Sequence, residues 1–227
     1  MQARSHRLRS ARWLIAVLGT GLSAALGAQV PGRCETPVGD RQGEIGCYLL
    51  DAHAVPDLPA QPLYWHIVAF PALADARAAV AGPRQQALMS QGRAWLFAIE
   101  PQTWNAGSGE RIAVIGPLPV TRGLSYTARY MESSTPAGMR PMVHAHSGPE
   151  AFHVLEGAQC VQTQAGATVI GAGENGITDA ETPMTLVGIG PAMRRALVLV
   201  LHDTSRPWST MSDWTPPAGA CEAAAAH

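Results

Sequence analysis

The twenty residues from Gly138 to Gly157 read GMRPMVHAHSGPEAFHVLEG and decide the interpretation of this chain. Alternate residues of an extended strand point to the same side, so His144 and His146 project from one face. The turn Ser147-Gly148-Pro149 reverses or bends the chain and returns Glu150 beside the two imidazoles. Two imidazole nitrogens and a carboxylate oxygen suit a divalent transition metal. We therefore expect His144, His146 and Glu150 to bind one ion of iron, manganese, nickel, copper or zinc.

Short strand-like segments surround this stretch on both sides. They are separated by turn residues, and no helical period lies between them. Such spacing is typical of a sandwich, barrel or jelly roll. The expected strands are Ile112–Ile115, Ser125–Met131, Met142–His146, Ala151–Leu155, Cys160–Thr163, Thr168–Ile170, Met184–Val187 and Arg195–His202.

The stretch resembles the first conserved motif of the cupin superfamily, G-x5-H-x-H-x3,4-E-x6-G. All its fixed positions are filled, by Gly138, His144, His146, Glu150 and Gly157. The resemblance implies a mainly β fold, a double-stranded β-helix (the cupin jelly-roll barrel) over about residues 112–205. It also implies that the site lies inside the barrel, and that the protein acts on or binds a small molecule.

The second cupin motif, G-x5-P-x-G-x2-H-x3-N, is degenerate. If it begins at Gly173, only that glycine matches, and Met184 stands where the family has its third metal-binding histidine. Three alternatives follow. The metal is held by the two histidines and Glu150 alone; or no metal binds and Glu150 pairs with a histidine in a ligand pocket; or copper binds with the Met184 thioether as a ligand.

Other residues are assigned by strand position. Phe152 and Met184, with Tyr126 and Tyr130 of the preceding strand, are expected to line the pocket. His153 alternates with Glu150 and Phe152 and is expected to point out of the barrel. His202 ends a strand and could reach the mouth of the barrel, although a histidine at a strand end is usually a surface residue. The glycines between Gly171 and Gly176 match a dinucleotide-binding spacing, but no helix follows them, so we expect a turn and no such cofactor.

The segment 1–28 reads as a Sec-type signal peptide, with four arginines, an apolar stretch from Trp13 to Leu26 and a cleavage point after Ala28. The apolar stretch is shorter than the ~20 residues of a membrane span. The alternative is an uncleaved anchor. We expect a periplasmic or secreted protein with no stable membrane span in its mature form.

An oxidising compartment favours disulfides between the four cysteines. Three pairings are open, of which Cys34 with Cys47 and Cys160 with Cys221 is preferred.

The segment 29–111 is expected to form a small α+β region before the barrel. Strands are expected at Gly46–Asp51, Leu63–Phe70 and Arg93–Glu100, and a helix at Ala72–Val80. The segment 206–227 is expected to be a tail.

The charge of the chain limits its partners and its chemistry. All 16 basic residues are arginines, and without residues 1–28 the formal net charge changes from −1 to −5. A negative protein is a poor partner for nucleic acid, and a chain without lysine has no Schiff-base chemistry. The sequence therefore predicts either a metal-dependent cupin oxygenase or isomerase, in which an unbound Glu150 would be a general base, or a metal-free small-molecule-binding protein. The resemblance to cupins also implies that the chain could form a homodimer.

Overall fold

The computed structural model describes residues 33–56 and 58–225. The expected signal peptide, residues 1–28, lies outside the described part. The strands form three sheets of six, five and four strands.

Eight consecutive strands make the barrel, and their order defines its fold. They are β7 (Tyr126–Thr135), β8 (His144–His146), β9 (Glu150–Glu156), β10 (Ala158–Thr163), β11 (Gly166–Gly171), β12 (Asn175–Thr178), β13 (Met184–Ile189) and β14 (Arg194–Asp203). One sheet has the order β7-β14-β9-β12 and the facing sheet has the order β11-β10-β13-β8. This interleaving of two antiparallel sheets is a jelly roll, which confirms the predicted double-stranded β-helix.

Three further strands extend the two barrel sheets. β2 (Gly46–Val55) pairs with β7 along its whole length, from Gly46 opposite Ser134 to Val55 opposite Tyr126. β1 (Arg33–Pro37) adds to β2 in parallel and leads into the short helix η1 (Val38–Asp40). β15 (Ser209–Met211) pairs with β8 on the other sheet. The region expected to precede the barrel and the expected tail thus both contribute strands to it.

The remaining strands form the four-stranded sheet β4-β5-β3-β6. Its members are β3 (Leu63–Phe70), β4 (Gln85–Ser90), β5 (Arg93–Pro101) and β6 (Glu110–Ile115). The helix α1 (Leu73–Ala78) packs on this sheet at Val68 and Phe70. We expected β6 to open the barrel, but it pairs with β3. The expected boundary at residue 112 therefore falls inside a strand of the N-terminal sheet.

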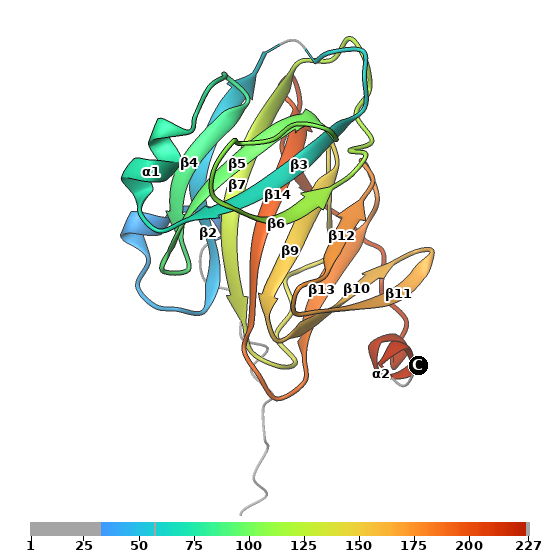
Figure 1. Cartoon of the computed structure of the whole chain (residues 1–227). Coiled ribbons are helices and arrows are strands. Elements are labelled where there is room, and N and C mark those ends of the chain that lie inside the picture. The colour runs from blue at the N-terminus through green and yellow to red at the C-terminus, as the bar shows by residue number, and fades with distance from the viewer. Residues whose placement is uncertain (1–32, 57, 226–227) are drawn as a thin grey trace, which may run out of the picture.

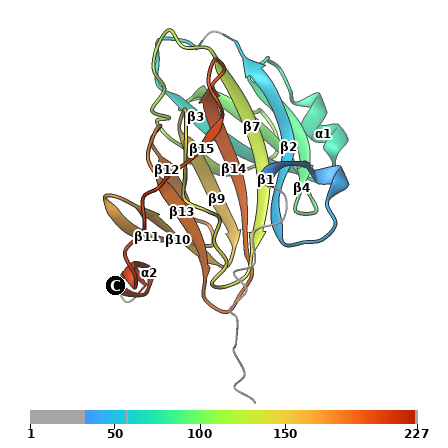
Figure 2. The same cartoon turned by 180° about the vertical axis from the view of Figure 1, so that it is seen from behind.

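The four-stranded sheet lies across the outer face of the six-stranded sheet (Figure 1), and the five-stranded sheet is seen from behind (Figure 2). Alternation along β14 separates two cores. Leu197, Leu199 and Leu201 pack in the core that the barrel shares with the four-stranded sheet. Val198 and Val200 pack in a second core inside the barrel. Both faces of β14 are therefore apolar.

Both preferred disulfides are confirmed. Cys34 is bonded to Cys47 on β2, and Cys160 on β10 is bonded to Cys221. Cys221 belongs to α2 (Ala220–Ala224), which lies beside the β10–β11 hairpin in both views (Figures 1 and 2). Within the described ranges, none of the helices has the length and apolar character needed to cross a bilayer.

Candidate functional site

The turn between β8 and β9 sets the position of Glu150 relative to the two histidines. A Cβ atom on Gly148 would lie 1.9 Å from the carbonyl oxygen of Leu201, so only glycine lets the turn approach β14 this closely. The neighbouring Pro149 carbonyl accepts a 3.0 Å hydrogen bond from the Leu201 N–H. The turn is therefore held against β14, and Glu150 begins β9 at a fixed point.

The hydrogen bonds of His144 and His146 define which ring nitrogens are free. The Nδ1 atom of His144 lies 2.8 Å from the Met142 carbonyl, and that of His146 lies 2.9 Å from the Trp208 carbonyl. A carbonyl can only accept, so each Nδ1 carries the proton and each neutral ring keeps its lone pair on Nε2. Burial lowers the pKa of both imidazoles, that of His146 to about 3. Both rings are therefore neutral at neutral pH, the state in which histidine binds metals.

Glu150 presents an unpaired oxygen to one of these nitrogens. Its side chain is buried, and Oε2 lies 3.8 Å from Nε2 of His146. This oxygen has no hydrogen-bond partner among the described residues. Burial raises the pKa of Glu150 to about 7, although the charge of Arg194 opposes the rise. An imidazole lone pair and a carboxylate thus face each other at a separation that a shared cation would stabilise.

The side chains of the three predicted ligands have donor atoms that suit a metal ion, but they do not all lie close enough together to bind one ion. The ring centroids of His144 and His146 are 4.9 Å apart, and only His146 forms a close pair with Glu150. No group of three or more His, Cys, Asp or Glu side chains in residues 33–56 and 58–225 is arranged to hold a metal ion.

The expected pocket residues divide between the two cores. Met184 is buried and lies opposite His144 in the pairing of β13 with β8. Phe152 belongs to the core inside the barrel. Tyr126 and Tyr130 belong instead to the core beneath the four-stranded sheet, where Tyr130 stacks on Phe97. The two tyrosines therefore do not line the barrel interior, because their neighbour Met131 takes the inward position on β7.

The two other barrel histidines are both buried. His153 lies on the opposite face of β9 from Phe152, as expected, but β12 shields it and its Nδ1 lies 2.7 Å from Asn175 Oδ1. His202 has only 8% of its surface exposed, so the surface position expected for it is wrong. Its charge contributes to the lowered pKa of His146, behind the larger effects of burial and of His144. A Cβ atom on Gly148 would lie 3.0 Å from the Cα atom of His202, so His202 lies beside the turn between β8 and β9.

Trp208 is a site residue that the sequence reasoning missed. Its ring stacks on His146 with centroids 5.2 Å apart, and the Arg129 guanidinium lies 4.5 Å from its centroid. The Trp208 Nε1–H donates to Glu35 on β1. Trp208 directly precedes β15, in the segment expected to be a tail. No local pattern indicates this contact, which depends on pairing between β15 and β8.

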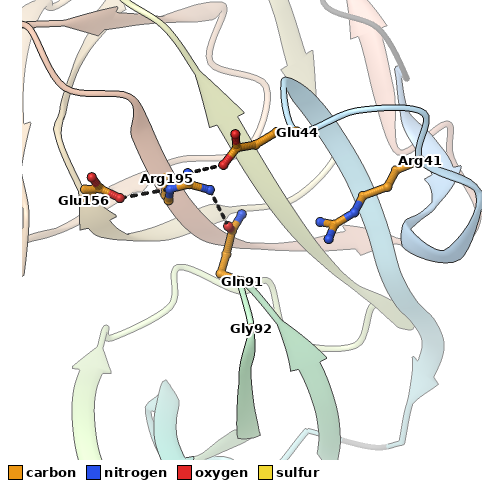
Figure 3. A pocket seen from close by; sticks show the side chains of 6 residues that line it. All are labelled: Arg41, Glu44, Gln91, Gly92, Glu156 and Arg195. Atoms are coloured by element: carbon orange, nitrogen blue, oxygen red, sulfur yellow. Dashed lines mark hydrogen bonds and ion pairs between the residues drawn. The ribbon is translucent and has the colours of Figure 1, made fainter.

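Two surface hollows lie outside this cluster. One of about 510 Å³ is polar: Arg195 contacts Glu44, Glu156 and Gln91 there (Figure 3). These contacts join the barrel rim to the tip of the β4–β5 hairpin, which is a structural role. The other, of about 760 Å³, lies between the β10–β11 hairpin and β12. Phe152 and Val161 line it and also belong to the inner core, so part of the groove wall is formed by that core.

Comparisons with known proteins give only partial matches. No protein-family model matches the chain, and no curated protein does. A variant of salicylate 1,2-dioxygenase from Pseudoaminobacter salicylatoxidans in complex with gentisate is 17% identical, with a TM-score of 0.33, over 38% of this chain and 24% of its own. A cupin-like protein from Thermotoga maritima is 12% identical, with a TM-score of 0.35, over 37% of this chain and 64% of its own.

Oxalate oxidase in complex with glycolate is 15% identical over 38% of this chain and 45% of its own, with a TM-score of 0.31. The chain thus spans less than two thirds of each of these three proteins. The strands from β7 to β14 have the order of a jelly roll, and the segment between Gly138 and Gly157 fills the fixed positions of the motif that resembles the first cupin motif.

Proposed function

We propose that the protein is an exported cupin that binds a small molecule and one divalent transition metal inside its barrel. The observation that supports the metal is the buried pair formed by Nε2 of His146 and Oε2 of Glu150. These two atoms face each other at 3.8 Å, and no hydrogen bond joins them. His144 offers the same free nitrogen from the same strand. His144, His146 and Glu150 would hold the ion.

The chemistry would be that of a metal-dependent oxygenase or isomerase. The bound ion would supply a Lewis acid or an oxygen-activating centre. The chain's own residues orient the ligands: the Met142 and Trp208 carbonyls fix both imidazole tautomers, and Trp208 covers one face of His146. This arrangement keeps Nε2 of His146 directed away from the backbone and toward Glu150.

The alternative function is a metal-free binding protein, which two observations favour. Met184 stands where the family's third histidine is expected, and a pKa of about 7 leaves Glu150 largely protonated in weakly acidic solution. A protonated Glu150 would donate a hydrogen bond to a bound ligand instead of binding a metal.

Elemental analysis distinguishes the two functions. The wild-type protein, reconstituted with each candidate metal and desalted, should retain about one equivalent of one of them. The His144→Ala/His146→Ala double variant should retain none, and His53→Ala, which removes a histidine from β2, should behave as the wild type. Wild-type protein without stoichiometric metal would exclude the metal-dependent function.

Export is supported by the two disulfides and by the signal-like segment 1–28. Expression of the full chain with mass spectrometry of the exported product tests it. The expected mature chain begins at Gln29 in the periplasm or the medium, and protein that stays cytoplasmic at full length would contradict export.

A further inference from the structure

A buried arginine without a carboxylate partner lies inside the barrel. Arg194 begins β14 and has 3% of its surface exposed. It shares the inward face of the strand with Val198 and Val200. Its Nη1 donates to the Ser133 hydroxyl at 2.6 Å, and its Nε has no partner. Among the described residues no carboxylate forms an ion pair with it, although a buried guanidinium is costly without one.

An unpaired amide lies at the same end of the barrel. Gln159 on β10 is fully buried, and neither its Oε1 nor its Nε2 has a hydrogen-bond partner in the described part of the chain. It shares the inward face of β10 with Val161. A Cβ atom on Gly157, two residues earlier, would lie 3.0 Å from the Cα atom of Arg194, so β10 starts directly against β14 at this point. Gln159 therefore adds an unpaired donor and an unpaired acceptor at the end of the barrel where Arg194 begins β14.

The arginine also acts on the proposed metal site. Its charge lowers the pKa of Glu150 against the larger effect of burial, so the two buried groups interact electrostatically inside the barrel. The pKa of Arg194 itself is lowered by burial to about 10, so it stays charged at neutral pH. Phe152 and Val161, which line the surface groove beside β12, also belong to the core inside the barrel.

We infer that the barrel's ligand is a small organic acid whose carboxylate binds Arg194 and Gln159 while the rest of the molecule extends toward His146 and Glu150. The guanidinium offers paired N–H donors that match a carboxylate, and such a charge-assisted pair would supply the missing counter-charge. The Gln159 amide would donate to the same ligand, or accept from a hydroxyl on it. This inference deepens the proposed function and rests on it for the presence of a ligand in the barrel.

Calorimetric titration of the mature protein with acids and their neutral amides tests the inference. The probe pairs are lactate with lactamide, malonate with malonamide and benzoate with benzamide, in buffer free of chloride and phosphate. At least one acid should bind about tenfold or more tightly than its amide, because only the acid pairs with the buried charge. The inference is overturned if no acid is preferred, or if chloride or phosphate binds as tightly as the best acid.

Two variants locate the binding. Arg194→Met should weaken binding of the preferred acid about tenfold or more and leave the amide unchanged, and Gln159→Leu should weaken the same acid. Arg195→Met is the matched control: it removes an arginine from the same strand but from the outer face, and should bind acid as the wild type does. Unchanged acid affinity in Gln159→Leu and Arg194→Met would refute the assignment. If Arg194→Met does not fold, Gln159→Leu and the wild-type comparison decide.

Metal analysis of the same preparations separates this inference from the proposed function. Acid preference without stoichiometric metal would uphold the organic acid and reject the metal. Stoichiometric metal without acid preference would uphold the metal and reject the organic acid. Gln159→Leu should retain the metal content of the wild type, because Gln159 is neutral and is not among the proposed ligands.

Discussion

Gly148 shows how one residue without a side chain positions the candidate site. We expect Gly148→Ala to destabilise the protein by about 1–3 kcal/mol, because its Cβ would overlap the Leu201 carbonyl and push the turn off β14. Urea denaturation gives the free energy of unfolding. Gly39→Ala is the control, since nothing lies within 4 Å of a Cβ at that position, and it should change stability little. Equal stability of the two variants would show that the turn shifts at no cost.

Glu150 should make the stability of the metal-free protein depend on pH. Its pKa is about 7 in the folded state, above the ordinary value of 4.5, so the folded protein keeps this proton to a higher pH than the unfolded chain. The contribution of Glu150 to stability is therefore present below pH 4.5 and is lost as the pH rises toward 7, by about 3 kcal/mol.

The matched variant is Glu150→Gln, which cannot titrate there. Its stability relative to the wild type should increase between pH 4.5 and 7, as measured by chemical denaturation in the presence of chelator. The buried histidines, whose lowered pKa values act in the opposite direction, are common to both proteins and cancel in the difference. A difference that does not change with pH would contradict the buried, unpaired state of Glu150.

At this scale the sequence predicts contacts that are close in the chain and misses those that are distant. His144, His146 and Glu150 are joined by one strand and one turn, so their spacing was informative. Arg194 begins β14 and Trp208 directly precedes β15, and no local pattern reveals how these two strands pair. Tyr130 was misplaced because both faces of β7 are buried, and alternation alone does not say which face is inside.

Among the elements, α2 depends on a covalent bond for its position. We expect Cys160→Ser/Cys221→Ser to lower the free energy of unfolding by about 2–4 kcal/mol, because the bond closes a long loop. Hydrogen exchange should also quicken in α2 and at the edge of the β10–β11 hairpin.

The second disulfide provides the comparison. Cys34 and Cys47 are separated by 13 residues, against 61 for Cys160 and Cys221, so Cys34→Ser/Cys47→Ser should cost less. Exchange in α2 that is unaffected by loss of its own disulfide would show that packing alone holds this helix.

Most strands were foreseen, but not their partners. β2 and β6 were both identified by their apolar patterns, yet β2 joins the barrel and β6 joins the four-stranded sheet. Strand pairing depends on contacts between residues far apart in the chain, and a period-two pattern contains no information about the neighbour. The domain boundary expected at residue 112 therefore did not coincide with the division between sheets.

For the whole molecule, the core shared by the barrel and the four-stranded sheet predicts that the barrel is not stable alone. We expect replacement of residues 56–125 by a two-residue Asn-Gly turn to give an insoluble or loosely packed protein, because Leu197, Leu199 and Leu201 would face water. Near-ultraviolet circular dichroism and solubility measure the outcome. Threonine at these three positions in the shortened chain should restore solubility. A soluble, cooperatively melting product without these substitutions would show that the barrel folds independently.

Val55 at the end of β2 pairs with Tyr126 at the start of β7, and the whole four-stranded sheet lies between these two residues in the sequence. The four-stranded sheet is formed by the residues between Val55 and Tyr126, which are neighbours on paired barrel strands. It is therefore an insertion in the hairpin that joins β2 to β7, and its gain or loss would not change the order of the barrel strands. His144, His146, Glu150 and Arg194 all lie outside that insertion. The four-stranded sheet can therefore change in length or sequence without altering the order of the barrel strands, as long as it still covers Leu197, Leu199 and Leu201.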